Sequence, residues 1–268
     1  SFLKVSTMNN DNKGSGGRTR KIIVLLAVIL IVVGVGIMLF QAISIQNAKN
    51  KDAELTSSTT TQTSTEQATV ANKIDFDSLK KKNKEIYAWI KVPGTKVNYP
   101  IVQSSTDDAV YLKHSATDKS YSSSGAVYTQ SMNKKDFTDR VTVIYGHNGY
   151  GDTYFTTLHR FEKQDFFEKH KKFVIYTANE KLTYRIVSAF KYDDRHIMNS
   201  FDFHDDNIFK EFIEMVQNPT SSNKNVSNSL DKEITIDDNI VVLSTCFTGQ
   251  KSNRYLVCGV LVKNEKTN

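Results

Sequence analysis

An uncharged stretch of 24 residues, Ile22 to Ile45, most limits how this 268-residue chain can fold. A helix of this length, at about 1.5 Å per residue, crosses a bilayer core of roughly 30 Å. The stretch is longer than the apolar region of a signal peptide, and no A-x-A cleavage site follows it. A buried helix of a soluble domain would show an amphipathic period instead. We therefore expect an uncleaved transmembrane helix over residues 22–45, preceded by a tail over residues 1–21.

The charges on either side of this segment predict its orientation. The tail has a local net charge of +4, from Lys4, Lys13, Arg18, Arg20 and Lys21 against Asp11. By the positive-inside rule, the tail is cytoplasmic and everything after residue 45 is extracellular, on a single-pass protein of the cell membrane. Only +2 of the total net charge of +6 remains beyond the tail, without a basic and aromatic stripe. Nucleic acid is therefore not an expected partner.

The remaining chain divides into a polar stalk and one globular domain. Residues 46–72 are polar, and ten of the fourteen residues from Thr56 to Thr69 are Ser or Thr. Such a segment buries too little apolar surface to fold, which predicts a flexible stalk. Residues 73–268 are then the catalytic or binding domain. At the start of the chain, Met8 is an alternative native start, which would place residues 1–7 outside the native sequence.

Hydrophobic periodicity predicts a mainly β domain. Two helices are expected, over residues 74–92, capped by Asp75 or Asp77, and over residues 205–216. Short β-branched or aromatic runs predict strands over residues 96–102, 125–129, 141–145, 173–177, 182–190, 234–236, 240–245 and 254–262. About eight short strands with few helices indicate a β-barrel or a sandwich with helical insertions.

Two cysteines lie in this domain, and a disulfide between them is the first possibility for an extracellular protein. If residues 240–245 and 254–262 form a hairpin, Cys246 faces Arg254 or Tyr255, while Cys258 faces Val242. These positions are too far apart along the ladder for a disulfide. We therefore expect two free thiols, with Cys258 a small buried hydrophobic side chain.

Three residues at strand ends suggest acyl-transfer chemistry. Cys246 follows the apolar strand, and Arg254 opens the returning strand beside it. A cation lowers the pKa of a neighbouring thiol and offers donors to an oxyanion. His147 ends the run of residues 141–146, so the three predict a nucleophile, a proton carrier and an oxyanion stabiliser.

The other histidines and the metal-ligand motifs give weaker signals. Five histidines in polar or helical surroundings are expected at the surface: His114, His159, His170, His196 and His204. The cysteines lack C-x-x-C spacing and no H-E-x-x-H occurs, which argues against a zinc site.

These motifs resemble the sortases of Gram-positive bacteria, and class B among them. The resemblance is carried by Leu243-Ser244-Thr245-Cys246 with Arg254, by Tyr145-Gly146-His147-Asn148, and by the segment Asn98 to Gln103. The interval of 99 residues from His147 to Cys246 is similar to the helix-bearing insertion of class B. Val242 departs from the family pattern T-L-x-T-C, which has Thr there.

The resemblance implies a transpeptidase on an eight-stranded sortase barrel. Cys246 would attack the backbone carbonyl of a Thr in a C-terminal sorting motif of a secreted protein, giving a thioacyl-enzyme. His147 would act as general acid and base, and Arg254 would stabilise the oxyanion or position the substrate. The acceptor would be an amine of peptidoglycan or its precursor, and no cofactor is needed.

Three further residues are candidate substrate contacts: Ser244, Thr245 and Asn98. Ser244 lies two residues before Cys246 and should share its face of the strand. Asn98 matches a substrate-groove position of the family, although a turn-forming Asn explains it equally well. Alternatives to the wall-anchoring transpeptidase are a pilus-polymerising sortase, a membrane-anchored cysteine hydrolase and an exported binding domain.

Overall fold

The computed structural model describes residues 35–43, 46, 70–228, 230 and 232–268. Two compact units divide the chain at Ser44, and residues 35–43 of the first unit are helical. Within these described ranges, no helix combines the length and the apolar character needed to span a membrane. Most of the transmembrane helix predicted over residues 22–45, and most of the stalk predicted over residues 46–72, lie outside the described residues.

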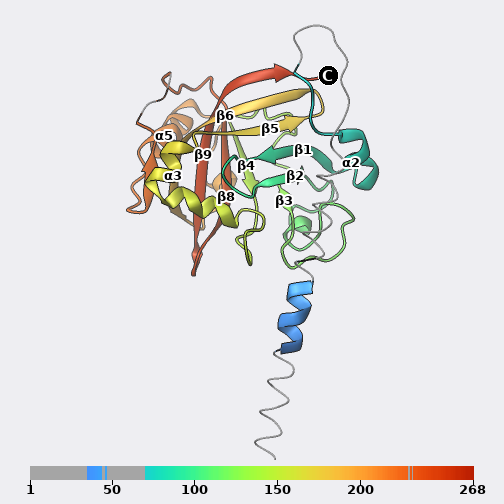
Figure 1. Cartoon of the computed structure of the whole chain (residues 1–268). Coiled ribbons are helices and arrows are strands. Elements are labelled where there is room, and N and C mark those ends of the chain that lie inside the picture. Colours follow the sequence, from blue (N-terminus) through green and yellow to red (C-terminus); the bar gives the residue numbers. More distant parts are fainter. Residues whose placement is uncertain (1–34, 44–45, 47–69, 229, 231) are drawn as a thin grey trace, which may run out of the picture. The chain divides into compact units, whose positions relative to one another are not determined.

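The second unit is built on a closed β-barrel (Figure 1). Its strands are β1 (Ile86–Lys91), β2 (Asn98–Val102), β3 (Val127–Tyr128), β4 (Val141–Tyr145), β5 (Lys172–Thr177), β6 (Glu180–Asp193), β7 (Lys224–Val226), β8 (Ile240–Phe247) and β9 (Gln250–Lys266). They follow the order β5-β1-β2-β3-β4-β8-β9-β6-β7. Because β5 also pairs with β6, eight strands close into a barrel and β7 extends one edge. The predicted mainly β, eight-stranded barrel is confirmed.

Six short helical segments surround the barrel. They are α2 (Phe76–Lys82), η1 (Val110–Leu112), η2 (Thr156–Glu162), α3 (Gln164–Lys169), α4 (Ile197–Ser200) and α5 (Asp206–Gln217). Figure 1 shows α2 and α5 at opposite sides of the barrel. The expected N-terminal helix and the helix-bearing insertion, here α4 and α5 between β6 and β8, are both present.

The helix predicted over residues 74–92 is wrong in its second half. Asp75 caps α2 as expected, since its side chain accepts from the Ser78 amide, but the helix ends at Lys82. The backbone N–H of Asn83 closes the last turn, and its side chain accepts from the Glu85 amide. Residues 86–91 then form β1, which pairs with β2 on one edge and β5 on the other. Pairing on both edges outweighs an apolar spacing that also fits a helix.

The remaining strand predictions match the structure apart from two short segments. The run over residues 234–236 lies outside any strand, although Ile234 is buried in the core. Strand β7 was not expected, because Lys224-Asn225-Val226 has no apolar alternation and pairs only with the edge of β6.

Alternation along β8 divides the core between the barrel interior and its outer face. Val241 and Leu243 belong to the interior cluster, while Val242 belongs to a second cluster on the outer face. Helix α5, confirmed within one residue of its predicted bounds, covers that face with Phe209, Phe212, Ile213 and Val216. Each fully buried side chain of this size contributes about 1.5–3 kcal/mol. The packing of α5 therefore fixes the outer face of β8.

Candidate active site

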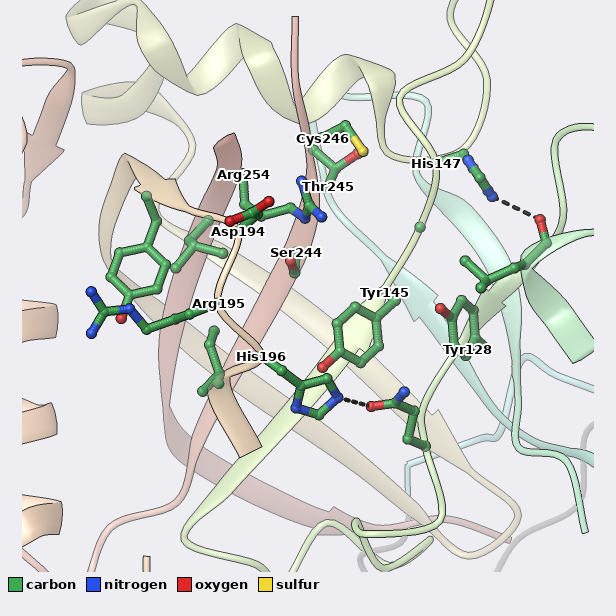
Figure 2. A pocket seen from close by; sticks show the side chains of 16 residues that line it. Tyr128, Tyr145, His147, Asp194, Arg195, His196, Ser244, Thr245, Cys246 and Arg254 are labelled. Atoms are coloured by element: carbon green, nitrogen blue, oxygen red, sulfur yellow. Dashed lines mark hydrogen bonds between the residues drawn. The ribbon is translucent and has the colours of Figure 1, made fainter. Parts of the chain in front are cut away.

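A cavity of about 220 Å³ opens where β4, β8 and β9 meet. It brings together five of the residues predicted from the sequence, namely His147, Ser244, Thr245, Cys246 and Arg254 (Figure 2). Its walls come from η1, β3, the end of β6 and the start of α4. Reactive side chains therefore lie at rigid strand ends, while the walls come from loops and short elements.

The β8–β9 ladder positions the candidate nucleophile. Cys246 pairs with Arg254, and Val242 pairs with Cys258, as the hairpin predicts. Both cysteines are free, so the alternative of a disulfide is wrong. Cys246 is exposed at the end of the strand, whereas Cys258 is fully buried. Burial raises the pKa of the Cys258 thiol to about 12, which keeps that thiol protonated and unreactive.

Arg254 lies across the ladder from Cys246 and has donors to spare. Its Nη1 donates to the carbonyl oxygens of Lys251 at 2.9 Å and Asn253 at 3.2 Å. Among the described residues, Nε and Nη2 have no hydrogen-bond acceptor. A guanidinium carries five N–H donors, so those that remain can bind an anionic oxygen formed beside the sulfur.

His147 follows β4 and contacts a different part of the barrel. Its Nε2 lies 2.8 Å from the carbonyl oxygen of Leu112, the last residue of η1. Because a carbonyl only accepts, Nε2 carries a proton in this arrangement. Figure 2 shows the ring turned away from Cys246. Among the described residues, no hydrogen bond joins this imidazole to the Cys246 thiol.

A family model described as a sortase domain matches residues 90–262 of the chain. The chain belongs to the sortase family. A sortase B from Staphylococcus aureus is 30% identical over 191 residues, which are 70% of this chain and 75% of that protein. The solved Staphylococcus aureus sortase B–substrate complex is similar with a TM-score of 0.63 and 29% identity, covering 81% of this chain and 94% of that chain.

A crystal structure of sortase B from Bacillus anthracis is also similar, with a TM-score of 0.69 and 26% identity. The match covers 82% of this chain and 99% of that chain. Together with the family model, these similarities identify a class B sortase, which is a cysteine transpeptidase. The non-enzyme alternative, an exported binding domain, is thereby set aside.

Phenolic side chains form a wall of the sortase cavity that the sequence did not predict. Tyr128 stacks on Tyr145 with ring centroids 5.4 Å apart. Burial raises the pKa of Tyr128 to about 12 and also raises that of Tyr145, so both stay neutral. The hydroxyls of Tyr145 and Tyr192 are buried and have no hydrogen-bond partner among the described residues. The wall therefore consists of uncharged aromatic side chains.

Two histidines expected at the surface lie at the site instead. His196 lines the cavity, where Nε2 is 2.6 Å from Gln130 Oε1 and Nδ1 accepts from the amide of Asn199. The side chain of His159 is only 14% exposed and lies 3.1 Å from the backbone oxygen of Cys246. Each histidine has one partner far away in sequence, Gln130 for His196 and Cys246 for His159, and local polarity does not reveal these contacts.

Asn98 does not reach the cavity. Its Oδ1 accepts from Trp89 Nε1 at 2.9 Å, across the β1–β2 pair. The proposed substrate contact at Asn98 therefore lacks support here, and the residue holds an indole instead. Ser244 is buried at the cavity, and the Thr245 hydroxyl is buried without a partner among the described residues. Among those residues, no group of His, Cys, Asp or Glu could hold a metal ion.

Proposed function

We propose that this sortase cleaves a C-terminal sorting motif of secreted proteins, with Cys246, His147 and Arg254 in the three chemical roles. The observation that supports this proposal is the opening of all three side chains onto one cavity. The exposed thiol faces the guanidinium across the β8–β9 ladder. A neighbouring cation favours the thiolate and stabilises the tetrahedral oxyanion.

The reaction has two acyl-transfer steps. The Cys246 thiolate attacks the carbonyl carbon of the motif's Thr, and Arg254 binds the resulting oxyanion. As the C–N bond breaks, the His147 imidazolium gives its proton to the departing amine, which leaves a thioacyl-enzyme. An acceptor amine then attacks the thioester, His147 takes a proton from it, and the C–S bond breaks to restore the thiolate.

The acceptor distinguishes the remaining alternatives. An amine of peptidoglycan or its precursor gives wall anchoring, a lysine of another pilin gives a pilus polymer, and water gives hydrolysis. We favour the peptidoglycan amine. Mass spectrometry of products from a peptide library supplied with several amines identifies the acceptor and the motif together. Products that consist only of hydrolysed peptide, despite abundant amine, would support the hydrolase.

Single substitutions test the residue roles. Cys246→Ala should abolish turnover of a sorting-motif peptide, a loss of at least about 10⁴-fold, because Cys246 supplies the only thiol among the described residues that line the cavity. His147→Ala should lower kcat by about 10³-fold, since proton transfer contributes about 10² to 10⁴. His204→Ala is the matched control, because His204 is exposed on the segment before α5. Full activity of Cys246→Ala would overturn every thiol mechanism.

We also propose that residues 22–45 anchor the enzyme, with the tail cytoplasmic and the catalytic domain extracellular. Confinement of enzyme and membrane-bound substrates to one surface raises their effective concentration. A membrane-impermeant maleimide should label the exposed Cys246 on intact cells, and Cys246→Ala should remove that label. Labelling that requires lysis, or an enzyme that washes off membranes in salt, would contradict this topology.

A further inference from the structure

The peptide group that follows Cys246 leaves the strand ladder. In the β4–β8 pair the register ends at Tyr145 and Ser244, and the Gly146 amide donates to the Ser244 carbonyl at 3.1 Å. On the other side, the β8–β9 register shifts directly after Cys246. A backbone carbonyl at such a point needs another partner. The orientation of this group therefore depends on side chains.

Asn148 supplies the first partner. Its Nδ2 donates to the Cys246 carbonyl oxygen at 3.0 Å and to Thr248 Oγ1 at 2.9 Å. Asn148 lies two residues beyond Gly146, where the parallel ladder would place its next amide donor. The Asn148 side chain thus donates to the Cys246 carbonyl where a backbone amide would do so in a continued ladder. It also links Cys246 to Thr248, two residues further along the chain.

His159 supports Asn148 and lies beside the same carbonyl. This residue belongs to η2, and its Nε2 lies 3.1 Å from both the Cys246 carbonyl oxygen and Asn148 Nδ2. Its Nδ1 lies 2.6 Å from Glu162 Oε1. Since a carboxylate accepts, Nδ1 carries the proton and donates it to Glu162. Nε2 then has a lone pair and accepts from Asn148 Nδ2, the group that also donates to the Cys246 carbonyl.

The imidazole of His159 is itself held firmly. Its ring stacks on Tyr255 with centroids 4.9 Å apart and meets the edge of Phe247 at 5.7 Å. Glu162 is fixed from its other oxygen, which accepts from Asn223 Nδ2 at 2.9 Å. The Asn148 amide, which donates to the Cys246 carbonyl, is therefore held by a side chain that has little freedom of its own.

We propose that Asn148, His159 and Glu162 form a clamp that orients Cys246 for attack. The peptide group and the thiol share one Cα, so a tilt of the peptide plane moves the sulfur. Displacements of about 1 Å cost an enzyme roughly 100-fold in rate. These three are positioning residues: Asn148 bonds the backbone of the nucleophile, His159 and Glu162 act through Asn148, and none of them touches the reacting atoms. The proposal rests on the role of Cys246 proposed above.

Two substitutions at His159 separate the clamp from simple packing. His159→Phe keeps a ring for Tyr255 but removes both nitrogens, so kcat should fall about tenfold with KM within twofold. His159→Gln restores a polar group near the carbonyl and should recover part of kcat. Asn148→Ala should cost a similar factor, and the double variant should be little worse than either single variant, because the contacts act as a unit.

His170→Phe is the matched control. His170 also stacks on an aromatic ring, Phe166 at 4.0 Å, and its Nδ1 lies 3.0 Å from that residue's carbonyl, but it is remote from the cavity. This variant should keep kcat unchanged. Equal losses of kcat in His170→Phe and His159→Phe, in step with the folded fraction, would reduce the clamp to a packing contact and overturn the proposal.

Single-turnover measurements complete the test. In His159→Phe the thioacyl adduct, followed by mass spectrometry with a sorting-motif peptide, should form about tenfold more slowly. Alkylation of Cys246 by iodoacetamide should keep its rate, because this reaction requires no alignment with a bound carbonyl. Adduct formation at the wild-type rate would overturn the clamp alone. Absence of any adduct on wild-type Cys246 would instead overturn the proposed catalytic role of that residue.

Discussion

Two halves of the candidate active site are held in different ways. Cys246 and Arg254 lie on neighbouring strands whose register runs without interruption from Ile240 opposite Val260. His147 follows a strand end as well, but its ring contacts the carbonyl of Leu112, which belongs to the long connection between β2 and β3. One half is thus positioned by a ladder inside the core, and the other by a connection whose described structure is mostly irregular.

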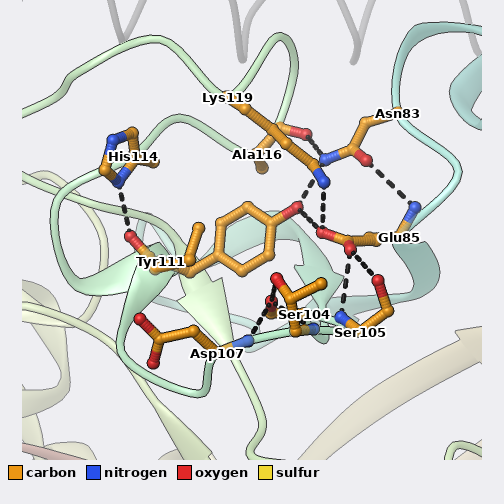
Figure 3. A network of polar contacts seen from close by, with 11 residues as sticks. Asn83, Glu85, Ser104, Ser105, Asp107, Tyr111, His114, Ala116 and Lys119 are labelled. Atoms are coloured by element: carbon orange, nitrogen blue, oxygen red, sulfur yellow. Dashed lines mark hydrogen bonds and ion pairs between the residues drawn. The ribbon is translucent and has the colours of Figure 1, made fainter.

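A buried polar network supports that connection (Figure 3). The Glu85 carboxylate accepts from Tyr111 Oη at 2.5 Å and from Ser105 at 2.8 and 3.0 Å, and it pairs with Lys119 at 2.8 Å. Asn83 donates to the same Tyr111 hydroxyl at 2.8 Å. Because Tyr111 directly precedes Leu112, the network fixes the carbonyl that contacts His147.

This difference in support predicts different effects of substitutions in the two halves. Substitutions at the open end of the hairpin remove reacting groups but few buried contacts. Substitutions in the network remove buried hydrogen bonds and also displace the support of the histidine. We therefore expect the hairpin half to lose activity alone, and the connection half to lose activity together with stability.

Among the substitutions that compare the two halves, Arg254→Ala should give the largest effect. Removal of one oxyanion donor costs about 100- to 1000-fold in kcat, or about 3–4 kcal/mol of transition-state stabilisation. The melting temperature should stay nearly constant, because Arg254 bonds only local carbonyls. Arg195→Ala is the control: Arg195 lines the same cavity, but its guanidinium pairs with Asp193. Steady-state kinetics checks this prediction. Equal losses of kcat in both variants would contradict the proposed role of Arg254 in oxyanion stabilisation.

Glu85→Gln should come next, with an effect on stability that depends on pH. Burial alone would raise the pKa of Glu85, but hydrogen bonds from Lys119, Tyr111 and Ser105 outweigh it and lower the pKa from 4.5 to about 2. The folded state thus favours the carboxylate by about 3 kcal/mol, a contribution complete above about pH 5 and lost as the pH falls towards 2. The variant should lose up to this amount at pH 7.

Urea unfolding from pH 7 to pH 2 checks this prediction, since the gap between wild type and variant should close at low pH. kcat should fall severalfold at pH 7, as the Leu112 carbonyl loses its support. Glu180→Gln is the control, because Glu180 pairs with Lys266 far from the cavity. A Glu85→Gln enzyme that loses stability with unchanged kcat would break the link between network and histidine.

Gly125→Ala tests the same connection through the backbone. Gly125 has a φ of +57°, and a Cβ there would lie 2.5 Å from the backbone oxygen of Tyr111 and 2.6 Å from the backbone oxygen of Leu112. Gly151 has a similar φ of +65°, but a Cβ there would meet nothing within 4 Å. Gly125→Ala should therefore cost about 2 kcal/mol of stability and lower the activity. Gly151→Ala should cost only about 1 kcal/mol of stability and leave the activity unchanged. Thermal melts and kcat of the two variants check this prediction. Equal losses in both would show that the close backbone oxygens at Gly125 do not matter.

The hairpin half of the site could be predicted from the sequence because its determinants are local. A β-branched run, a polar turn and a returning run set the register, and the register places Arg254 opposite Cys246. The wrong helix over residues 86–91 shows the limit of this approach: Ile86 and Ile90 fit a helical period, and only pairing with β2 and β5 decides for a strand. His159 lies 87 residues from Cys246, so no local pattern links them.

Cys258→Ala should have the smallest effect and sharpens the comparison within the hairpin itself. Cys258 shares the ladder with Cys246 but lies in the buried outer cluster, and its raised pKa keeps it protonated. Loss of its sulfur should cost about 1 kcal/mol of stability, as a small cavity does, with kcat unchanged. Titration with a disulfide reagent should find one fast thiol per native wild-type chain, two after unfolding, and still one fast thiol in Cys258→Ala. A second fast thiol in the native protein would show that the pairing of Val242 with Cys258 opens in the folded state. The β8–β9 hairpin would then be no more rigid than the connection that supports His147.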